Sequence, residues 1–403
     1  MKNSKKIFKC QVSNVEIKKI LNLGKIPLVN RFTKTFSKKY NFSLNLCYSK
    51  KSKLFQINEI VNKKLLFSKN YSYTSSTTKI LRENFKELGD KVKKKYHLKR
   101  NDLILDIGSN DGNLLSFFKN HCNVLGVTPE NVAKIAIRRG IPTIQRYFDK
   151  SLVIEIKKKY KTPKIITATN VIAHIENPNE LIKNIKYLLD NNSIFISESH
   201  YFVDVIRHNQ FDSIYHEHLR YYTLASLNYL FKQHKLFIFD AEKISTHGGS
   251  IRVYSSIKKI KKSARLLKLI KDEKKIITKK NILLFKTNTK KIKSQFVELI
   301  KKLKKNRKTI SCISSPSRSV TLLNYCNLNE KHFNKIYEIS GSQKIGKLFP
   351  GTRIPIVNEK KIKFDKPDYL VILSWHISKE LIKKIKKSTK AKFIIPLPKI
   401  KII

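Results

Sequence analysis

The stretch LILDIGSNDGNLL, residues 103–115, decides the fold. LILDIG (103–108) predicts a buried strand, and the polar turn after it leads into a helical stretch, NLLSFFKN. Gly108 and Gly112 have the spacing G-x-x-x-G, not the G-x-G-x-x-G of dinucleotide-binding folds. A glycine after a strand lets the backbone pass close to a ligand, so this turn favours a methyltransferase over a dehydrogenase. An ordinary glycine turn is the alternative for this segment alone.

Strands and helices alternate on both sides of this stretch. A helix is expected over 77–97, a second strand over 123–127, and another helix from near Glu130. Further strands are expected over 164–170 and 193–199, with a helix over 180–190 between them. This alternation predicts an α/β fold whose parallel sheet is covered on both faces.

The rest of the chain divides around this centre. Residues 1–60 read as short and irregular, and residues 257–310 are lysine-rich with helical apolar spacing. Strand patterns then return at 309–315, 335–340, 369–374 and 392–397, which predicts a second α/β domain. We therefore expect a small N-terminal domain (1–70), a central Rossmann-like domain (71–255), a helical connection (256–308) and a C-terminal Rossmann-like domain (309–403).

Lysine and arginine number 85 against 29 acidic residues, giving a formal net charge of +56. A charge of this size ordinarily indicates nucleic acid or an anionic membrane as partner. Lysine is spread over nearly every segment, however, which indicates a biased overall composition more than a local binding surface. No apolar run is long enough to span a membrane, the N-terminus lacks a secretory signal, and the five scattered cysteines indicate no disulfide framework. We expect a cytoplasmic protein that binds neither membrane nor nucleic acid.

Polar residues at the strand ends form the candidate site for the methyl donor. In methyltransferases an acidic residue at the end of the second strand usually binds the ribose hydroxyls. Here that position is Thr128, and Glu130, two residues later, is the acid that could replace it. The residues expected to line this site are Asp106, Gly108, Ser109, Asn110, Gly112, Thr128, Pro129 and Asn170.

Several longer motifs carry a more specific resemblance. In chain order they are LNLGKIPLVNRF (21–32), NYSYTSST (70–77), TATNVIAHIENPNELI (167–182), FDSIYHEHLRYYTL (211–224), STHGGSIRVY (245–254), SSPSRSVTLLNYCNL (314–328) and KIGKLFPGTRIPIVNE (344–359). Together they resemble the sugar C-methyltransferases, which use S-adenosylmethionine to methylate nucleotide-linked 4-keto-deoxysugars. The resemblance covers nearly the whole chain in the right order, and YHEH and HGGSIRVY are its most specific pieces.

The resemblance implies roles for a set of catalytic residues. His218 would be the base that removes a proton from the carbon beside the ketone, with Glu217 and Tyr215 shaping or polarising the site. If the YHEH segment is extended, His216 and His218 share one face and Tyr215 and Glu217 the other. His174, just after a strand end, corresponds to another histidine that the family uses. The pair Tyr71 and Tyr73 matches a segment that reaches over the active site.

Other residues are candidates for holding the nucleotide sugar. His247 would support a tight turn, Gly248 and Gly249 would let the backbone approach the substrate, and Arg252 could pair with a phosphate oxygen. In the C-terminal domain, Arg318, Lys344 and Arg353 are the expected cations for the diphosphate. Each of these cations could equally be an ordinary surface charge.

The family's N-terminal domain holds zinc with two C-x-x-C pairs. Here the corresponding segments read Cys10-Gln-Val-Ser13 and Cys47-Tyr-Ser-Lys50, so half of each pair is missing. Two thiolates do not make a closed tetrahedral zinc site. We therefore interpret Cys10 and Cys47 as remnants and predict that this domain keeps its shape without zinc.

The sequence is compatible with three functions. The leading one is a sugar C-methyltransferase acting on a nucleotide-linked keto-deoxysugar. An RNA methyltransferase would use the basic surface but would leave YHEH and the C-terminal domain without a role. A non-catalytic relative would explain Thr128 and the missing cysteines, although the histidines of the catalytic cluster are present.

Overall fold

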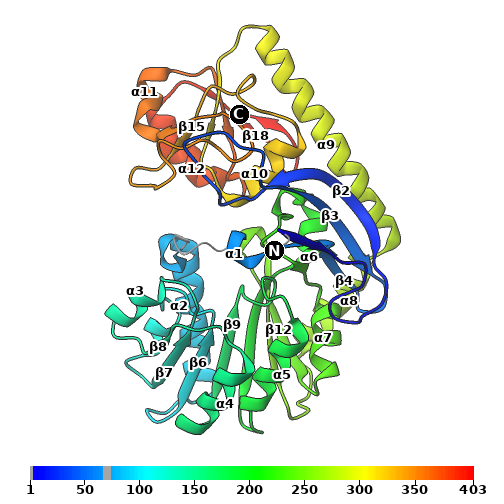
Figure 1. Cartoon of the computed structure of the whole chain (residues 1–403), viewed down its shortest axis with the longest axis vertical. Helices are drawn as coiled ribbons and strands as arrows, with labels where there is room; N and C mark the ends of the chain where they lie inside the picture. The colour runs from blue at the N-terminus through cyan, green and yellow to red at the C-terminus, as the bar shows by residue number, and fades with distance from the viewer. Residues whose placement is uncertain (1–2, 67–73) are drawn as a thin grey trace.

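The computed structural model describes residues 3–66 and 74–403, and Figure 1 shows them arranged in two lobes. The lower lobe contains a seven-stranded sheet in the order β12-β13-β10-β9-β6-β7-β8. The five strands from β8 to β10 run parallel, and β13 is antiparallel to both of its neighbours. The strands are β6 (Leu103–Ile107), β7 (Asn123–Val127), β8 (Thr143–Ile144), β9 (Ile165–Thr169), β10 (Ile194–His200), β12 (Phe237–Ile244) and β13 (Ser250–Ser256).

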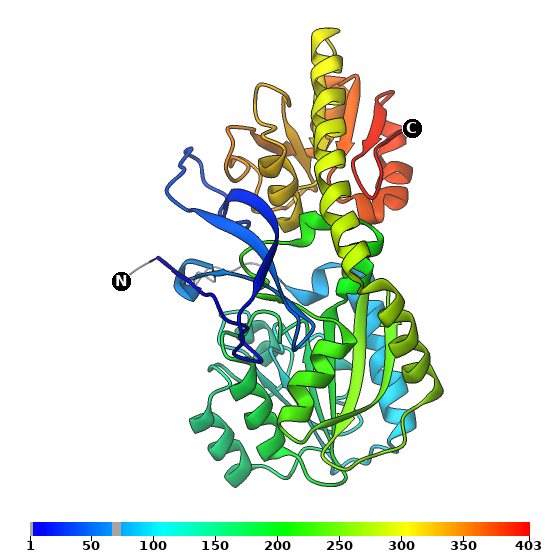
Figure 2. The same cartoon turned by 90° about the vertical axis from the view of Figure 1, so that its right-hand side faces the viewer.

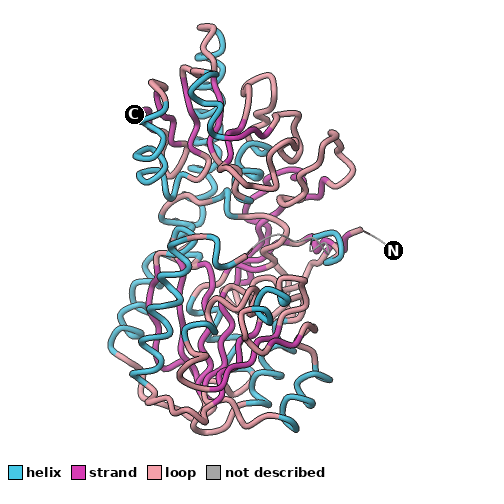
Figure 3. Tube along the Cα trace, turned by 90° about the vertical axis from the view of Figure 1, so that its left-hand side faces the viewer, coloured by secondary structure: helices cyan, strands magenta, loops and turns pink. Residues whose placement is uncertain are grey.

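Helices cover both faces of this sheet (Figure 3). They are α2 (Lys79–Lys95), α3 (Ala133–Arg138), α4 (Lys150–Lys159), α5 (Pro178–Leu188) and α7 (Leu224–Gln233). The short helix α6 (Phe202–Arg207) follows β10 and lies between the two lobes (Figure 1). Local sequence explains where several begin: the Asn177 side chain accepts from the backbone of Glu180, and Thr223 forms a capping box with Ser226. The predicted α/β fold with its parallel sheet is confirmed.

Two predicted helices differ from the structure. The stretch NLLSFFKN forms only a short 3₁₀ turn, Leu115–Phe117, because Ser116 bonds back to the Asn113 carbonyl and the chain soon returns to β7. The helix expected from near Glu130 begins at Ala133, since the Glu130 side chain is bonded to Thr128 before the helix starts.

The N-terminal region is a set of strands and not an irregular segment. Its four-stranded antiparallel sheet has the order β11-β4-β3-β2, and a two-stranded sheet joins β1 and β5. Strand β11 comes from the lower lobe and follows directly on the YHEH motif, so this sheet also contacts that motif. The bounds are β1 (Ser4–Lys6), β2 (Lys18–Pro27), β3 (Asn41–Ser49), β4 (Leu54–Ile57), β5 (Glu59–Val61), the short helix α1 (Lys63–Leu66) and β11 (Arg220–Tyr221).

The upper lobe contains a six-stranded sheet in the order β16-β15-β14-β17-β18-β19, parallel except for β19. The chain reaches it through α8 and the long helix α9, which runs along one side of the molecule (Figure 2). The elements are α8 (Ala264–Ile276), α9 (Lys279–Lys305), β14 (Ile310–Ile313), α10 (Ser317–Tyr325), β15 (Ile336–Glu338), β16 (Ile356–Asn358), α11 (Ile362–Asp365), β17 (Tyr369–Ile372), α12 (Ser378–Ile385), β18 (Lys392–Ile395) and β19 (Lys401–Ile402).

One hydrophobic cluster joins the three regions of the chain. It contains Leu44 of the N-terminal sheet, Phe211 of the lower lobe, and Phe296 and Ile310 of the α9 and β14 region, all fully buried. A shared core of this kind holds the lobes in one arrangement. None of the helices in the described ranges has the length and apolar character required of a membrane span.

Candidate active site

A cavity of about 3000 Å³ lies between the lobes and takes its wall from all three regions. The N-terminal region contributes Asn30 and its neighbours, and the lower lobe contributes the carboxyl ends of β6, β7, β9 and β10. The upper lobe contributes the loop between β14 and α10. Ligands bind at the carboxyl ends of strands in open α/β sheets, so this cavity is where the fold places a ligand site.

The end of the cavity near β6 contains the residues predicted for the methyl donor. Of that set, the wall includes Asp106, Gly108, Ser109, Asn110, Thr128, Pro129 and Asn170. Gly108 has φ +73°, and a Cβ built on it would lie 2.3 Å from Val171 Cγ2, so the turn requires glycine. Asp106 accepts a 2.6 Å hydrogen bond from the Thr167 hydroxyl, and burial raises the pKa of Asp106 to about 7.

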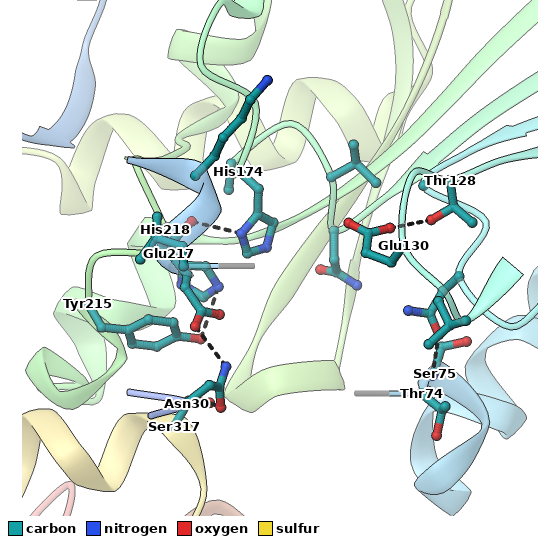
Figure 4. A pocket seen from close by; sticks show the side chains of 18 of the residues that line it. Asn30, Thr74, Ser75, Thr128, Glu130, His174, Tyr215, Glu217, His218 and Ser317 are labelled. Carbon is teal, nitrogen blue, oxygen red and sulfur yellow. Dashed lines mark hydrogen bonds between the residues drawn. The ribbon is translucent and has the colours of Figure 1, made fainter. Parts of the chain in front are cut away.

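A carboxylate lies beside Thr128 at the end of β7, although the expected acidic residue is absent from that position. Thr128 Oγ1 donates to Glu130 Oε2 at 2.6 Å, and both residues line the cavity. The Glu130 side chain therefore reaches back to the end of β7 (Figure 4). This returns an acceptor for hydroxyl groups to that position.

A histidine and tyrosine cluster faces the donor end from the opposite side of the pocket (Figure 4). His174 Nδ1 lies 2.7 Å from the Glu217 carbonyl, to which it donates, so the ring lone pair is on Nε2. Tyr215 Oη lies 3.0 Å from His218 Nε2. The rings of His174 and His218 are 4.9 Å apart between centroids. Structure thus brings four predicted catalytic residues into one group.

The YHEH segment is a turn and not an extended strand. His218 N donates to the Tyr215 carbonyl, so Tyr215 and His218 meet instead of lying on opposite faces. His216 points the other way, where its Nε2 lies 3.3 Å from the Ser43 carbonyl. The expectation that His216 and His218 share a face was therefore wrong, because an alternating pattern applies only to extended chain.

Burial keeps the cluster histidines neutral at physiological pH. Desolvation lowers the pKa of His174 to about 4, and that of His218 falls well below the ordinary value. Nearby rings of His174, His200 and His247 lower the His218 pKa further. A neutral imidazole can accept a proton, which is the state a general base requires.

Two predicted phosphate ligands are buried ion-pair partners instead. Arg252 is fully buried and bonds to Glu198 at 2.6 Å and to Glu242 at 3.0 Å. Arg318 lines the cavity, but its guanidinium makes two hydrogen bonds to Asp212, of 2.9 and 3.0 Å. Arg252 therefore does not reach a phosphate, and the charge of Arg318 is compensated by Asp212.

The other predicted sugar-binding residues divide between the cavity and its surroundings. His247 and Lys344 line the wall, and Lys344 Nζ donates to the Ser315 carbonyl at 2.7 Å. Over the described ranges, the wall excludes Gly248, Gly249 and Arg353, and it also excludes Gly112 of the set predicted for the methyl donor. A Cβ on Gly248 would meet Gln210 Oε1 at 2.8 Å, and one on Gly249 would meet Asp204 Oδ2 at 2.6 Å, so these glycines permit packing within the chain. Tyr71 and Tyr73 lie outside the described residues.

The expected zinc remnants are arranged differently from the prediction. Cys10 Sγ lies 3.2 Å from Ser52 Oγ, and Ser13 Oγ lies 3.2 Å from Ser49 Oγ. The residues facing the first pair are therefore Ser49 and Ser52, and not Cys47, which lies on β3 with its pKa raised to about 11 by burial. One thiol with three hydroxyls does not suit zinc, and among the described residues no group of three or more metal-ligating side chains occurs.

Sequence reasoning assigned no role to several residues of the wall. Asn30 donates to Glu217 Oε1 at 2.7 Å and accepts from Ser317 Oγ at 3.1 Å. His200, at the end of β10, has its ring 6.5 Å from that of His218. The motif LNLGKIPLVNRF (21–32) includes Asn30. A single asparagine in a motif, however, does not indicate which distant residue its side chain will contact.

Comparisons with known proteins agree with this architecture. A family model described as a methyltransferase domain matches residues 76–236, and one described as a C-methyltransferase C-terminal domain matches residues 245–398. The C-methyltransferase NovU of Streptomyces niveus is 28% identical over 370 residues, which cover 90% of this chain and 88% of NovU.

Two solved structures are each similar to less than half of this chain. Magnesium protoporphyrin IX methyltransferase from Synechocystis, with bound S-adenosylmethionine, is 12% identical with a TM-score of 0.33, covering 43% of this chain and 78% of that one. A protein from Pyrococcus horikoshii is 15% identical with a TM-score of 0.38, covering 49% and 98%. Both family models match in order along one chain, and NovU is similar over nearly all of it, so the chain is an S-adenosylmethionine-dependent methyltransferase with a C-methyltransferase C-terminal domain.

Proposed function

We propose that the chain methylates the carbon atom beside the carbonyl of a nucleotide-linked keto-deoxysugar. The observation that carries the proposal is the pocket of Figure 4, where the carboxylate end with Glu130 faces the cluster of His174, Tyr215 and His218. The cavity volume of about 3000 Å³ exceeds the several hundred Å³ typical of a site for one small ligand. It therefore accommodates a cofactor and a large acceptor together.

The donor end fits S-adenosylmethionine, which supplies an electrophilic methyl group when it is bound. The turn at Gly108 lets the backbone approach a ligand, and Asp106 and Glu130 offer carboxylates for its polar groups. We assign the ribose hydroxyls to Glu130, oriented by Thr128. With Glu130 in this role, the threonine at the strand end no longer supports a non-catalytic relative.

The opposite end supplies the acid and base groups. His218, neutral at physiological pH, takes the proton from the acceptor carbon on Nε2. The protonated Nε2 then donates to Tyr215 Oη, which frees the Tyr215 hydroxyl proton to be donated to the developing enolate oxygen. The electron pair left on carbon forms the new carbon–carbon bond as the sulfur–methyl bond breaks. His174 and Glu217 hold this group in place through the 2.7 Å bond between them.

The upper lobe is suited to the diphosphate of the acceptor. Ser315 and Ser317 at the start of α10 line the cavity, with Lys344 beside them. A helix N-terminus and a lysine both attract phosphate oxygens. In the proposed site these residues bind the diphosphate, a role that the sequence had suggested for Arg252 and Arg353.

The test is methyl transfer from labelled S-adenosylmethionine to a panel of nucleotide-linked keto-sugars, with mass spectrometry of the product. We expect turnover of at least one keto-sugar and a loss of about 10²- to 10⁴-fold in kcat for His218→Ala. His208→Ala removes an exposed histidine and is the matched control. Binding of S-adenosylmethionine without transfer to any keto-sugar would contradict the proposed acceptor.

A further inference from the structure

Asn30 reaches the catalytic cluster from the N-terminal region. It follows β2 in a turn whose neighbours Leu28 and Val29 are 3% and 1% exposed, so the backbone there is anchored in the core. The Asn30 side chain itself is exposed to the cavity, next to Glu217 of the YHEH motif. Asn30 and Glu217 are 187 residues apart in the sequence.

Two hydrogen bonds fix how the Asn30 amide is oriented. Nδ2 donates to Glu217 Oε1 at 2.7 Å, and Oδ1 accepts from Ser317 Oγ at 3.1 Å (Figure 4). An ionised carboxylate only accepts, so the amide must present its NH₂ group to Glu217. The result is a chain from hydroxyl to amide to carboxylate that crosses from the upper lobe through the N-terminal region to the lower lobe.

A donor to the Glu217 carboxylate matters because the residue is only 4% exposed. A buried carboxylate is costly unless hydrogen bonds support its charge, and those from amide donors are strong and directional. The backbone carbonyl of the same residue accepts from His174 Nδ1. A displaced Glu217 would therefore displace the histidine as well.

We propose that Asn30 is a positioning residue that keeps Glu217 ionised and aligned with His174 and His218. This inference rests on the proposed function, because it assigns Asn30 an effect on proton removal that acts through Glu217. It also connects the N-terminal region to proton removal through Glu217, separately from any metal site.

The first test measures Glu217 without an acceptor. The ¹³C chemical shift of its carboxyl group, assigned with Glu217→Gln, is followed by NMR as pH changes. In Asn30→Ala the midpoint of the Glu217 titration should rise by about one pH unit or more, because a donor to the charged form is lost. An unchanged midpoint would overturn the proposal whatever the acceptor is.

The second test uses turnover with the accepted keto-sugar. Asn30→Asp keeps the shape but places a second carboxylate against Glu217, and we expect kcat to fall about 10²-fold with the acidic limb of the pH profile moved upward. KM for S-adenosylmethionine should change little. Asn30→Gln, which keeps the amide, should recover part of the loss, and Asn306→Asp at an exposed position is the matched control.

The two tests separate the inference from the function. A shifted Glu217 titration with no keto-sugar turned over would contradict the acceptor and leave the role of Asn30 intact. Turnover in the wild type with an unchanged rate and pH profile in Asn30→Asp would contradict the role of Asn30 and leave the function intact.

Discussion

Arg318 and Asp212 form a buried ion pair with two parallel hydrogen bonds that joins α10 of the upper lobe to the loop before YHEH. The Trp375 indole donates to the same carboxylate at 2.7 Å, and the ring of Trp375 lies 4.7 Å from the guanidinium carbon. Thr321 on α10 also donates to the Ile214 carbonyl of this loop. The upper lobe thus holds the loop that ends in the catalytic cluster.

Breaking this pair should destabilise the protein strongly. Arg318→Met leaves the Asp212 carboxylate buried without its partner, and we expect the free energy of unfolding to fall by about 3–5 kcal/mol. Lys308→Met removes a comparable pair with Asp368 at the surface, where we expect a change of at most about 1 kcal/mol. Equal effects of the two substitutions in chemical denaturation would contradict the role given to the buried pair.

Glu130 should determine affinity for the cofactor. Glu130→Gln removes the charge that would accept from the ribose hydroxyls, and we expect binding of S-adenosylmethionine to weaken about 10-fold or more in isothermal titration. Adding Thr128→Asp to Glu130→Ala returns a carboxylate at the strand end and should restore much of the affinity. Glu298→Gln, at an exposed position on α9, serves as control. Unchanged affinity in Glu130→Gln would exclude the assignment.

The rate of methyl transfer should not change with pH near 6.5, where a free histidine side chain titrates. Because burial lowers the pKa of His174 to about 4 and that of His218 well below its ordinary value, both imidazole rings stay neutral near pH 6.5. We expect kcat/KM to be flat through pH 6.5 and to fall only at pH values well below it. A midpoint near 6.5 in the pH–rate profile would show that the cluster is solvated during turnover.

The same shifts predict how stability depends on pH. Between pH 4 and 6.5 the unfolded chain binds protons on histidines that stay neutral in the folded protein, such as His216, whose pKa burial lowers to about 4. The unfolded state then carries more protons, so the free energy of unfolding should rise with pH across this window. His216→Gln should reduce that slope in urea denaturation at several pH values.

Zinc removal should leave the wild-type protein unchanged. Cys10, Ser13, Ser49 and Ser52 already satisfy one another by hydrogen bonds, so a chelator should not shift the melting temperature. Replacing the three serines by cysteine places four thiols in the same cluster, and we expect that variant to bind one zinc per chain by elemental analysis. A chelator-induced loss of stability in the wild type would contradict the metal-free interpretation.

Sequence patterns predicted the central sheet well because its parallel strands are short apolar runs buried on both faces. They failed for the N-terminal sheet for a physical reason. Strand β2 shifts register twice against β3, between Lys19 and Leu21 and between Asn22 and Lys25, so its apolar residues do not alternate cleanly. A period of two is visible only where the pairing is regular.

The site was predictable where one motif carries several of its residues, as in YHEH. Arg252 was misassigned because its partners come from neighbouring strands: it lies opposite Glu198 on β10 and Glu242 on β12, a register that only the sheet reveals. Asn30 and Glu130 have roles set by contacts that form in the folded chain. An arginine or asparagine in the sequence alone does not indicate which carboxylate it will meet.

The cavity wall includes residues from Lys5 near one end of the chain to His376 near the other. A ribosome releases these residues in order, and domains generally fold as they emerge. The central sheet has all its strands by residue 256, but the loop that α10 holds gains its partners only after residue 318 and Trp375 have been synthesised. A nascent chain that has not yet reached Trp375 therefore lacks contacts that hold this loop, so the active site is complete only after this part of the upper lobe has been synthesised.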